Sequence, residues 1–200
     1  MKRPGIGIGT DFSLLLTGKA TRHALAMSKP PDYTDFLDID GTRITIRTMH
    51  PEDRDIEEQF VRRLTPASKY NRFHTALREL TEYMLDHFTN VDYPDEMALI
   101  ATIRDGDAER EIGVARYVRT QAPDTAEIAV FVSDEWQGKG IGGKLLKDLR
   151  DLAHQAGIKH LEARVLPDNR RMLELAQDLG FRLKPRGEDF SAVELGKDVD

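Results

Sequence analysis

The chain has 200 residues, of which 40% are hydrophobic and 32% are charged, and this is enough apolar content for a folded domain with a core. Its formal net charge of −6 argues against the overall basic field that gathers nucleic acid or anionic lipid. The sequence lacks cysteine, which excludes disulfides and thiolate chemistry, and it has no apolar run near the roughly 20 residues that span a bilayer. We therefore expect a cytoplasmic protein with no nucleic-acid or membrane partner.

Residues 1–40 are predicted to be an N-terminal tail that is partly ordered or flexible. The segment is rich in glycine, contains Pro30 and Pro31, and has no sustained helical or strand period. A phosphate-binding loop is not predicted here, because Gly18-Lys19 is followed by Ala20 instead of serine or threonine. A regular hydrophobic pattern begins at Arg43, and we assign residues 41–200 to a single domain.

The first half of this domain is predicted to hold strands and helices in turn. Ile44 and Ile46 alternate with polar residues, which predicts a strand, and Pro51 then begins a helix. A second helical stretch covers about 67–87 and is interrupted near Leu80. Short, turn-rich links indicate an antiparallel meander of three strands, at 97–103, 112–119 and 126–132.

The second half begins with a helix. Apolar residues recur every three or four positions from Ile141 to Ala156, and Gly157 is expected to end this helix. The remaining predicted elements are a strand at 161–166, a helix at 169–179, and two short strands near Phe181 and Ala192. Together these elements predict an α/β fold with a mixed, mostly antiparallel central sheet of about seven strands and with about four helices.

The segment from Val130 to Gly143 passes from a strand through a glycine-rich loop into a helix. Glycines allow the backbone to approach a ligand closely, and the free N–H groups at the start of a helix carry partial positive charge. This pattern favours a pyrophosphate site. Glycines that only form a turn are the alternative. A dinucleotide-binding fold is not predicted, because an antiparallel meander precedes the loop instead of parallel βαβ units.

The motif Gln137-x-x-Gly140-x-Gly142 resembles the acyl-coenzyme A loop of the GNAT superfamily of N-acetyltransferases, and the order of elements from Arg43 to about Leu195 agrees with that superfamily. The segments 169–172 and 179–181 resemble its second cofactor-binding segment. A narrower set of motifs is similar to the Pat protein lysine acetyltransferases. This set comprises Ser68-Lys69-Tyr70-Asn71-Arg72-Phe73, Asp92-Tyr93, Glu96-Met97-Ala98-Leu99, Gly113-Val114-Ala115-Arg116-Tyr117 and Ala126-Glu127-Ile128-Ala129-Val130.

The resemblance implies a GNAT-like fold and acetyl-CoA as co-substrate. A metal is not expected, because the histidines lack the helical pair spacing of a metal site. Gln137 and the amides of the loop are expected to bind the pyrophosphate, and the pantetheine arm is expected to lie along Val130 and Val132. Asn169 either reaches that arm or caps its own helix. The predicted cofactor-binding residues are Val130, Val132, Gln137, Gly138, Lys139, Gly140, Gly142, Gly143 and Asn169.

Glu127 is the charged residue within the apolar run 126–132, and burial of a carboxylate without a partner is unfavourable. A lysine amine has a pKa of about 10.4, so a base must remove its proton before it attacks a thioester. We predict Glu127 as this base, and the resemblance places the family's catalytic glutamate here as well. A salt bridge to Arg116 or to another cation on the adjacent strand is the alternative. Many superfamily members carry a tyrosine acid where this chain has Ala176, so we assign no general acid.

The predicted function is transfer of an acetyl group to a lysine side chain of a protein, and the Pat resemblance implies an acyl-CoA synthetase as that protein. Acetylation of a small amine or of a peptide N-terminus is one alternative, and a non-catalytic acyl-CoA sensor is another. The sequence gives no oligomeric state. Candidates for the acceptor site, unless they only pack in a helix and a strand, are Tyr70, Arg72, Asp92, Tyr93 and Glu96.

Overall fold

A computed structural model describes residues 29–73, 79–184 and 192–199. Its strands form one eight-stranded sheet in the order β1-β2-β3-β4-β5-β6-β8-β7. The strands β5 and β6 run parallel, and the other neighbours are antiparallel. The strands are β1 (Thr34–Ile39), β2 (Thr42–Thr48), β3 (Glu96–Asp105), β4 (Ala108–Arg119), β5 (Thr125–Val132), β6 (His160–Val165), β7 (Arg182–Leu183) and β8 (Val193–Asp198).

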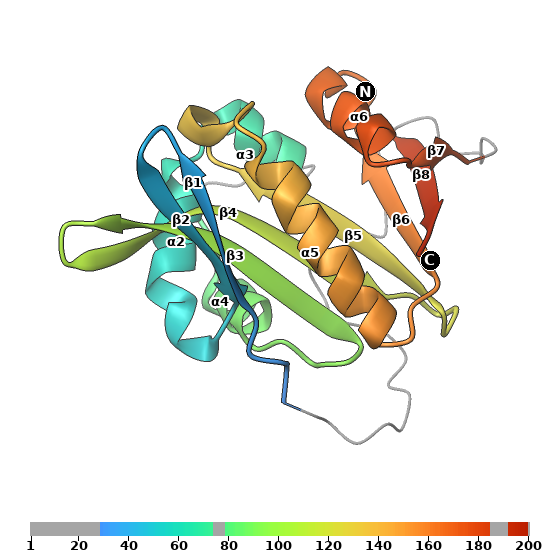
Figure 1. Cartoon of the computed structure of the whole chain (residues 1–200), viewed down its shortest axis with the longest axis horizontal. Coiled ribbons are helices and arrows are strands. Elements are labelled where there is room, and N and C mark those ends of the chain that lie inside the picture. Colours follow the sequence, from blue (N-terminus) through green and yellow to red (C-terminus); the bar gives the residue numbers. More distant parts are fainter. Residues whose placement is uncertain (1–28, 74–78, 185–191, 200) are drawn as a thin grey trace, which may run out of the picture.

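Helices cover both faces of the sheet (Figure 1). The helix α5 (Ile141–Gln155) crosses one face, where its leucines pack on apolar side chains of β2 to β6. The helices α2 (Arg54–Arg63) and α4 (Glu82–Thr89) cover the other face around Phe60, Phe88 and Ile100. The remaining helices are α3 (Pro66–Phe73), α6 (Arg170–Asp178) and two 3₁₀ turns, η1 (Pro51–Asp53) and η2 (Asp134–Trp136).

The mixed, mostly antiparallel α/β sheet agrees with the sequence-based prediction, with two differences in detail. The described residues contain eight strands and five α-helices, because the second helical stretch forms the separate helices α3 and α4. The added strand β1 lies inside the segment predicted as the N-terminal tail. The tail and domain boundary at residue 40 remains a prediction, and residues 1–28 of that tail lie outside the described part.

Two ion pairs connect the β1–β2 hairpin to α5 and to the loop before it. Lys144 Nζ lies 2.5 Å from an Asp35 oxygen on β1 and 2.6 Å from an Asp148 oxygen on α5. Lys139 Nζ lies 3.1 Å from an oxygen of Asp40 in the hairpin turn. Burial alone would lower the pKa of Lys144, but its hydrogen bonds to Asp148 and Asp35 outweigh burial and raise that pKa.

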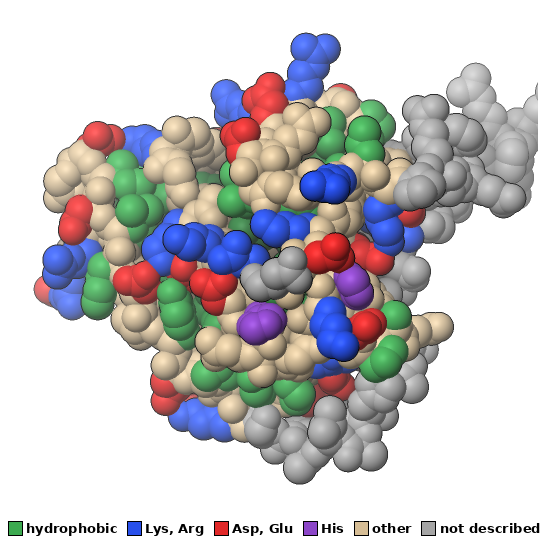
Figure 2. All heavy atoms as spheres, turned by 45° about the vertical axis from the view of Figure 1, so that its right-hand side comes forward, with side chains coloured by type: hydrophobic (Ala, Val, Ile, Leu, Met, Phe, Trp, Pro, Cys, Tyr) green, Lys and Arg blue, Asp and Glu red, His purple; other side chains and the backbone are tan. Residues whose placement is uncertain are grey.

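The face shown in Figure 2 carries acidic and basic side chains next to one another, while hydrophobic side chains form small separate groups. Charge on this face is therefore mixed, as expected for a chain whose basic and acidic residues number 29 and 35. Within the described ranges, the helices are too short or too polar to cross a membrane.

Candidate functional site

A cleft of about 780 Å³ lies where β5 ends, between α3, the start of α5 and α6. Its volume falls within the range typical of small-molecule sites, about 300 to 1,000 Å³. The side chains and backbone that line it are Leu64, Thr65, Ala67, Ser68, Val130, Phe131, Val132, Asp134, Trp136, Gln137, Gly138, Gly140, Ile141, Gly142, Gly143, Asn169, Arg171, Met172, Glu174, Leu175 and Asp178.

Divergence of the two parallel strands positions the cleft. The register of β5 with β6 pairs Thr125, Ala126 and Glu127 with residues 160–162, and it stops there. Beyond this point β5 continues to Val132 beside β4, whereas β6 continues beside β8. Beyond Glu127 this edge of β5 is therefore not paired with β6, and Val130, Phe131 and Val132 line the cleft. Backbone amide groups along such an edge can bind an extended ligand.

The loop between β5 and α5 exposes backbone N–H groups. Gly138 and Gly140 have φ angles of +74° and +85°, which glycine adopts without the steric cost of a Cβ. Gly140 is the N-cap of α5 and offers no side chain to its first turn. The first amides of α5 therefore have no acceptor within the helix, and they lie at its positive end.

The space at this helix start also fits a bulky anionic ligand such as a pyrophosphate. A Cβ on Gly142 would come within 3.3 Å of Leu175 Cδ2 and 3.6 Å of Val132 Cγ2, so a larger side chain would fill the narrow part of the cleft. A Cβ on Gly138 or Gly140 would have no atom within 4 Å, so these two glycines border open space. The residues of the loop thus suit close contact between backbone and phosphate.

The cleft brings together most of the predicted cofactor-binding residues. Lys139 is the exception, because its ammonium group lies over the Trp136 ring at 5.1 Å and pairs with Asp40. The residues of the predicted set that line the cleft are Val130, Val132, Gln137, Gly138, Gly140, Gly142, Gly143 and Asn169.

Gln137 connects three walls of the cleft. Its Nε2 donates to the Val132 carbonyl at 3.0 Å, and its Oε1 accepts from Arg171 Nη1 at 3.0 Å. Asn169 lines the same space, and its Oδ1 accepts from the Met172 amide at 3.3 Å. Asn169 therefore acts as a helix N-cap, which was one of its two predicted roles, and it remains a prediction that it also contacts a cofactor.

Glu127 is 7% exposed and does not line the cleft, whose wall begins on β5 at Val130. It is in register with Val118 of β4 and Glu162 of β6, and its side chain is on the sheet face opposite to that of Val130. The carboxylate is therefore buried at the last position where β5 and β6 are paired.

Arg116, the alternative partner considered for Glu127, forms an ion pair with Glu96 across a distance of 3.8 Å from Nη1 to Oε2. Its guanidinium also donates to the carbonyls of Phe88 and His87. Burial raises the pKa of Glu96 to about 7, although the charge of Arg116 acts in the opposite direction. Burial also lowers the pKa of Arg116.

Sequence reasoning missed the contribution of α3 to the cleft. Asp134 accepts hydrogen bonds from Ser68 Oγ at 2.6 Å and from the Thr65 amide at 3.3 Å, which joins the start of α3 to η2. These residues are 66 or more positions apart, so no local pattern indicates the contact. For Arg171 and Met172 a signal existed, because both belong to the segment that resembles a second cofactor-binding motif.

The candidate acceptor residues fall into two groups. Tyr70 is 46% exposed, and Asp92 and Tyr93 are half-buried. Arg72 and Glu96 are instead buried, and Arg72 Nη2 donates to Glu57 Oε1 at 2.5 Å inside the protein. Arg72 is therefore placed to hold α3 and not to meet an acceptor directly.

Comparison with known proteins gives consistent matches. The acetyltransferase (GNAT) domain family matches residues 43–182. Acetyltransferase PA5475 of Pseudomonas aeruginosa is 33% identical over 158 residues, which cover 79% of this chain and 84% of that protein. Acetyltransferase Pat of Mycolicibacterium smegmatis is 37% identical over 112 residues, or 56% of this chain, which spans only 33% of that longer protein.

A solved structure agrees with these sequence matches. The crystal structure of the GNAT domain of S. lividans PAT superposes with a TM-score of 0.75 at 29% identity, and the match covers 82% of this chain and 96% of that domain. Family, sequence and fold therefore coincide over the region that holds the cleft. The chain belongs to the GNAT family of acetyltransferases.

Proposed function

We propose that this enzyme transfers the acetyl group of acetyl-CoA to a lysine side chain of a protein, with Glu127 as general base. The observation that carries the proposal is the buried carboxylate of Glu127 at the point where β5 and β6 diverge, three residues before Val130 of the cleft wall. Similarity to acetyltransferase Pat and to the GNAT domain of S. lividans PAT supports the protein acceptor. An acyl-CoA synthetase is the protein class that the Pat resemblance implies.

Members of the GNAT family use acetyl-CoA, which when bound supplies an activated acetyl thioester. In the proposed site, the amides of the glycine loop and of the first turn of α5 hold the pyrophosphate. Gln137 closes the loop onto β5, and the free edge of β5 binds the pantetheine amides. Lys139 contributes its backbone N–H, because its side chain points toward Asp40.

The proposed chemistry begins with the acceptor amine. Only about one lysine amine in 10³ is neutral at pH 7, so Glu127 accepts the proton that the ammonium must lose. A backbone N–H in the segment 130–132 donates to the thioester oxygen as negative charge develops there. Ala176 is 1% exposed and has no acidic group, so it supplies no proton to the leaving thiolate. A thiol of pKa about 8.5 leaves adequately without such an acid.

Acidic residues form a row across the sheet on the acceptor side. The registers pair Glu96 with Val118, Val118 with Glu127, and Glu127 with Glu162. Directly paired residues share a face, so the three glutamates project from the same side of the sheet. Glu96 is paired with Arg116 and Glu162 with Lys184, so the row places Glu127 between two ion pairs.

The substrate class is tested by incubating the protein with labelled acetyl-CoA and either purified acyl-CoA synthetases or small amines. We expect label on a lysine of a synthetase. Label found only on small amines would replace the protein acceptor with a small-molecule acceptor. Binding of acetyl-CoA without transfer to either panel would contradict the enzymatic proposal and favour a sensor.

The role of Glu127 is tested by Glu127→Gln. We expect turnover to fall by about 10² to 10⁴ while acetyl-CoA still binds, because the variant keeps the shape of the side chain but cannot accept a proton. Glu162→Gln is the matched control, since Glu162 lies beside Glu127 in register and pairs with Lys184. We expect this control to keep most of the activity. Near-normal turnover of Glu127→Gln at every pH would remove Glu127 from catalysis.

A further inference from the structure

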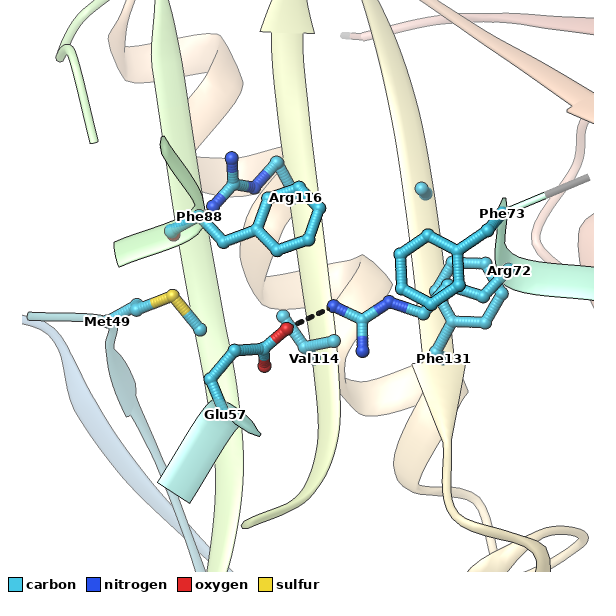
Figure 3. A pocket seen from close by; sticks show the side chains of 9 residues that line it. Met49, Glu57, Arg72, Phe73, Phe88, Val114, Arg116 and Phe131 are labelled. Atoms are coloured by element: carbon cyan, nitrogen blue, oxygen red, sulfur yellow. Dashed lines mark hydrogen bonds and ion pairs between the residues drawn. The ribbon is translucent and has the colours of Figure 1, made fainter. Parts of the chain in front are cut away.

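A second, smaller cavity lies on the α2 and α4 side of the sheet and is shown in Figure 3. This inner cavity has a volume of about 40 Å³. Its walls are mainly apolar, and they are formed by Met49, Glu57, Arg72, Phe73, Phe88, Val114, Arg116, Ala129 and Phe131. Phe131 also lines the cleft. The ring of Phe131 therefore separates the cleft from the inner cavity.

Buried neighbours hold this ring in place. The guanidinium carbon of Arg72 lies 5.4 Å from the centre of the Phe131 ring and 5.0 Å from that of Phe73 (Figure 3). Arg72 is in turn fixed by its ion pair with Glu57, whose side chain is fully buried. Because aromatic rings cover the faces of the guanidinium, the cavity presents carbon surface along most of its wall.

An acyl group in the proposed site would border this partition. The thioester must lie between the glycine loop and Glu127, and it is therefore beside residues 128–131 of β5. Side chains alternate along a strand, so Ala129 and Phe131 project from the same face as Glu127. An amine deprotonated by Glu127 approaches from that face, and the acyl carbon that it attacks lies next to these two side chains.

We propose that the Phe131 ring limits the length of the acyl chain, so that the enzyme accepts acetyl and rejects butyryl and longer chains. When the ring is removed, the inner cavity receives the alkyl tail. A cavity of about 40 Å³ has room for about three water molecules, which suits a few methylene groups. This inference rests on the proposed function, because it places the thioester beside Glu127.

The test measures dissociation constants of acetyl-CoA and butyryl-CoA by calorimetry, without an acceptor, for the natural protein and for Phe131→Leu. We expect the natural protein to prefer acetyl-CoA. In Phe131→Leu the ratio of the two constants should shift toward butyryl-CoA by about 15-fold, because each of two extra buried methylenes contributes a factor of about four. Transfer rates with the two donors should shift in the same direction.

Met49→Ala is the matched control, because Met49 lines the inner cavity but not the cleft. This variant enlarges the cavity and leaves the partition intact, so the ratio should stay as in the natural protein. Combined with Phe131→Leu, it should extend the preference toward hexanoyl-CoA. Ala129→Val provides a second test if Phe131→Leu fails to fold, because Ala129 borders the proposed acyl position on the same face as Phe131, and a larger side chain there should disfavour propionyl-CoA relative to acetyl-CoA.

An unchanged ratio in a folded Phe131→Leu that binds acetyl-CoA would overturn the inference, as would a shifted ratio in Met49→Ala alone. The inference would also be overturned if Ala129→Val kept the ratio of propionyl-CoA to acetyl-CoA dissociation constants of the natural protein. If the ratio shifts as expected but no lysine is acetylated, the chain-length role stands and the proposed acceptor fails. A natural protein that binds neither donor would overturn both proposals.

Discussion

At the scale of single residues, Glu96 has a clearly perturbed ionisation. It is 4% exposed, and burial raises its pKa to about 7, with further upward contributions from Asp92 and Asp95. Its partner Arg116 is itself buried. Glu96 therefore changes charge near neutral pH inside the row of carboxyl groups that includes Glu127.

This shift predicts a pH dependence of stability. Between pH 4.5 and about 7 the folded protein keeps a proton on Glu96 that the unfolded chain has lost, so the free energy of unfolding falls as pH rises through this window. Glu96→Gln lacks this dependence. Urea denaturation should therefore show that the free energy of unfolding of Glu96→Gln, relative to that of the natural protein, rises by about 2 to 3 kcal/mol from pH 5 to pH 8.

The control for this prediction is Glu58→Gln, which removes an equal formal charge from an exposed ion pair with Arg62 on α2. The difference in the free energy of unfolding between this variant and the natural protein should stay constant across the same pH range. If the free energy of unfolding of Glu96→Gln shows the same pH dependence as that of the natural protein, Glu96 does not titrate in this window.

At the scale of elements, the start of α5 depends on backbone conformation. Gly140 and Gly106 both have positive φ, +85° and +65°, and a Cβ on either would have no atom within 4 Å. Alanine at either position should lower the free energy of unfolding by about 1 to 2 kcal/mol through backbone strain alone. Gly140→Ala should also weaken acetyl-CoA binding, because it disturbs the turn that presents the α5 amides.

Gly106→Ala is the matched control, since Gly106 lies in the β3–β4 turn and does not line the cleft. Denaturation and calorimetry on both variants separate strain from binding. Equal loss of stability with equal acetyl-CoA affinity would show that the loop conformation is not needed for the cofactor.

Local patterns predicted most elements, and they failed where a long-range contact decides the structure. Gly157 and Gly180 adopt positive φ just after α5 and α6, as the predicted helix ends require. The strand β1 was missed because its inward side contains Asp35, which pairs with Lys144 and interrupts the apolar alternation expected of a half-buried strand. The GNAT resemblance of the loop was confirmed, whereas the α3 wall depends on a contact with Asp134 that no local motif indicates.

At the scale of the whole molecule, Lys144 joins the N-terminal hairpin to the central helix. Lys144→Met leaves the Asp148 carboxylate, 6% exposed at its side chain, without this cation. Removal of one partner from a buried pair is strongly unfavourable, and we expect a loss of about 3 kcal/mol in the free energy of unfolding.

Asp35→Asn is the comparison for this prediction, because the Asp35 side chain is 46% exposed. Loss of such an exposed partner should reduce the free energy of unfolding by less than about 1 kcal/mol. Urea denaturation of both variants distinguishes the two. Equal losses would mean that the hairpin contact, and not the buried pair within α5, carries the stabilisation.

The two side walls of the cleft differ in how firmly they are attached. The helix α3 is fixed at its end by the buried Arg72, which is enclosed by four phenylalanine rings and paired with Glu57, and the hydrogen bond from Ser68 to Asp134 at its start is exposed. Across the opposite side, the hydrogen bond from Arg171 to Gln137 is exposed to solvent. Departure of a spent coenzyme should therefore proceed by outward movement of α6, and the rate of product release should depend on Arg171 more than on any residue of α3.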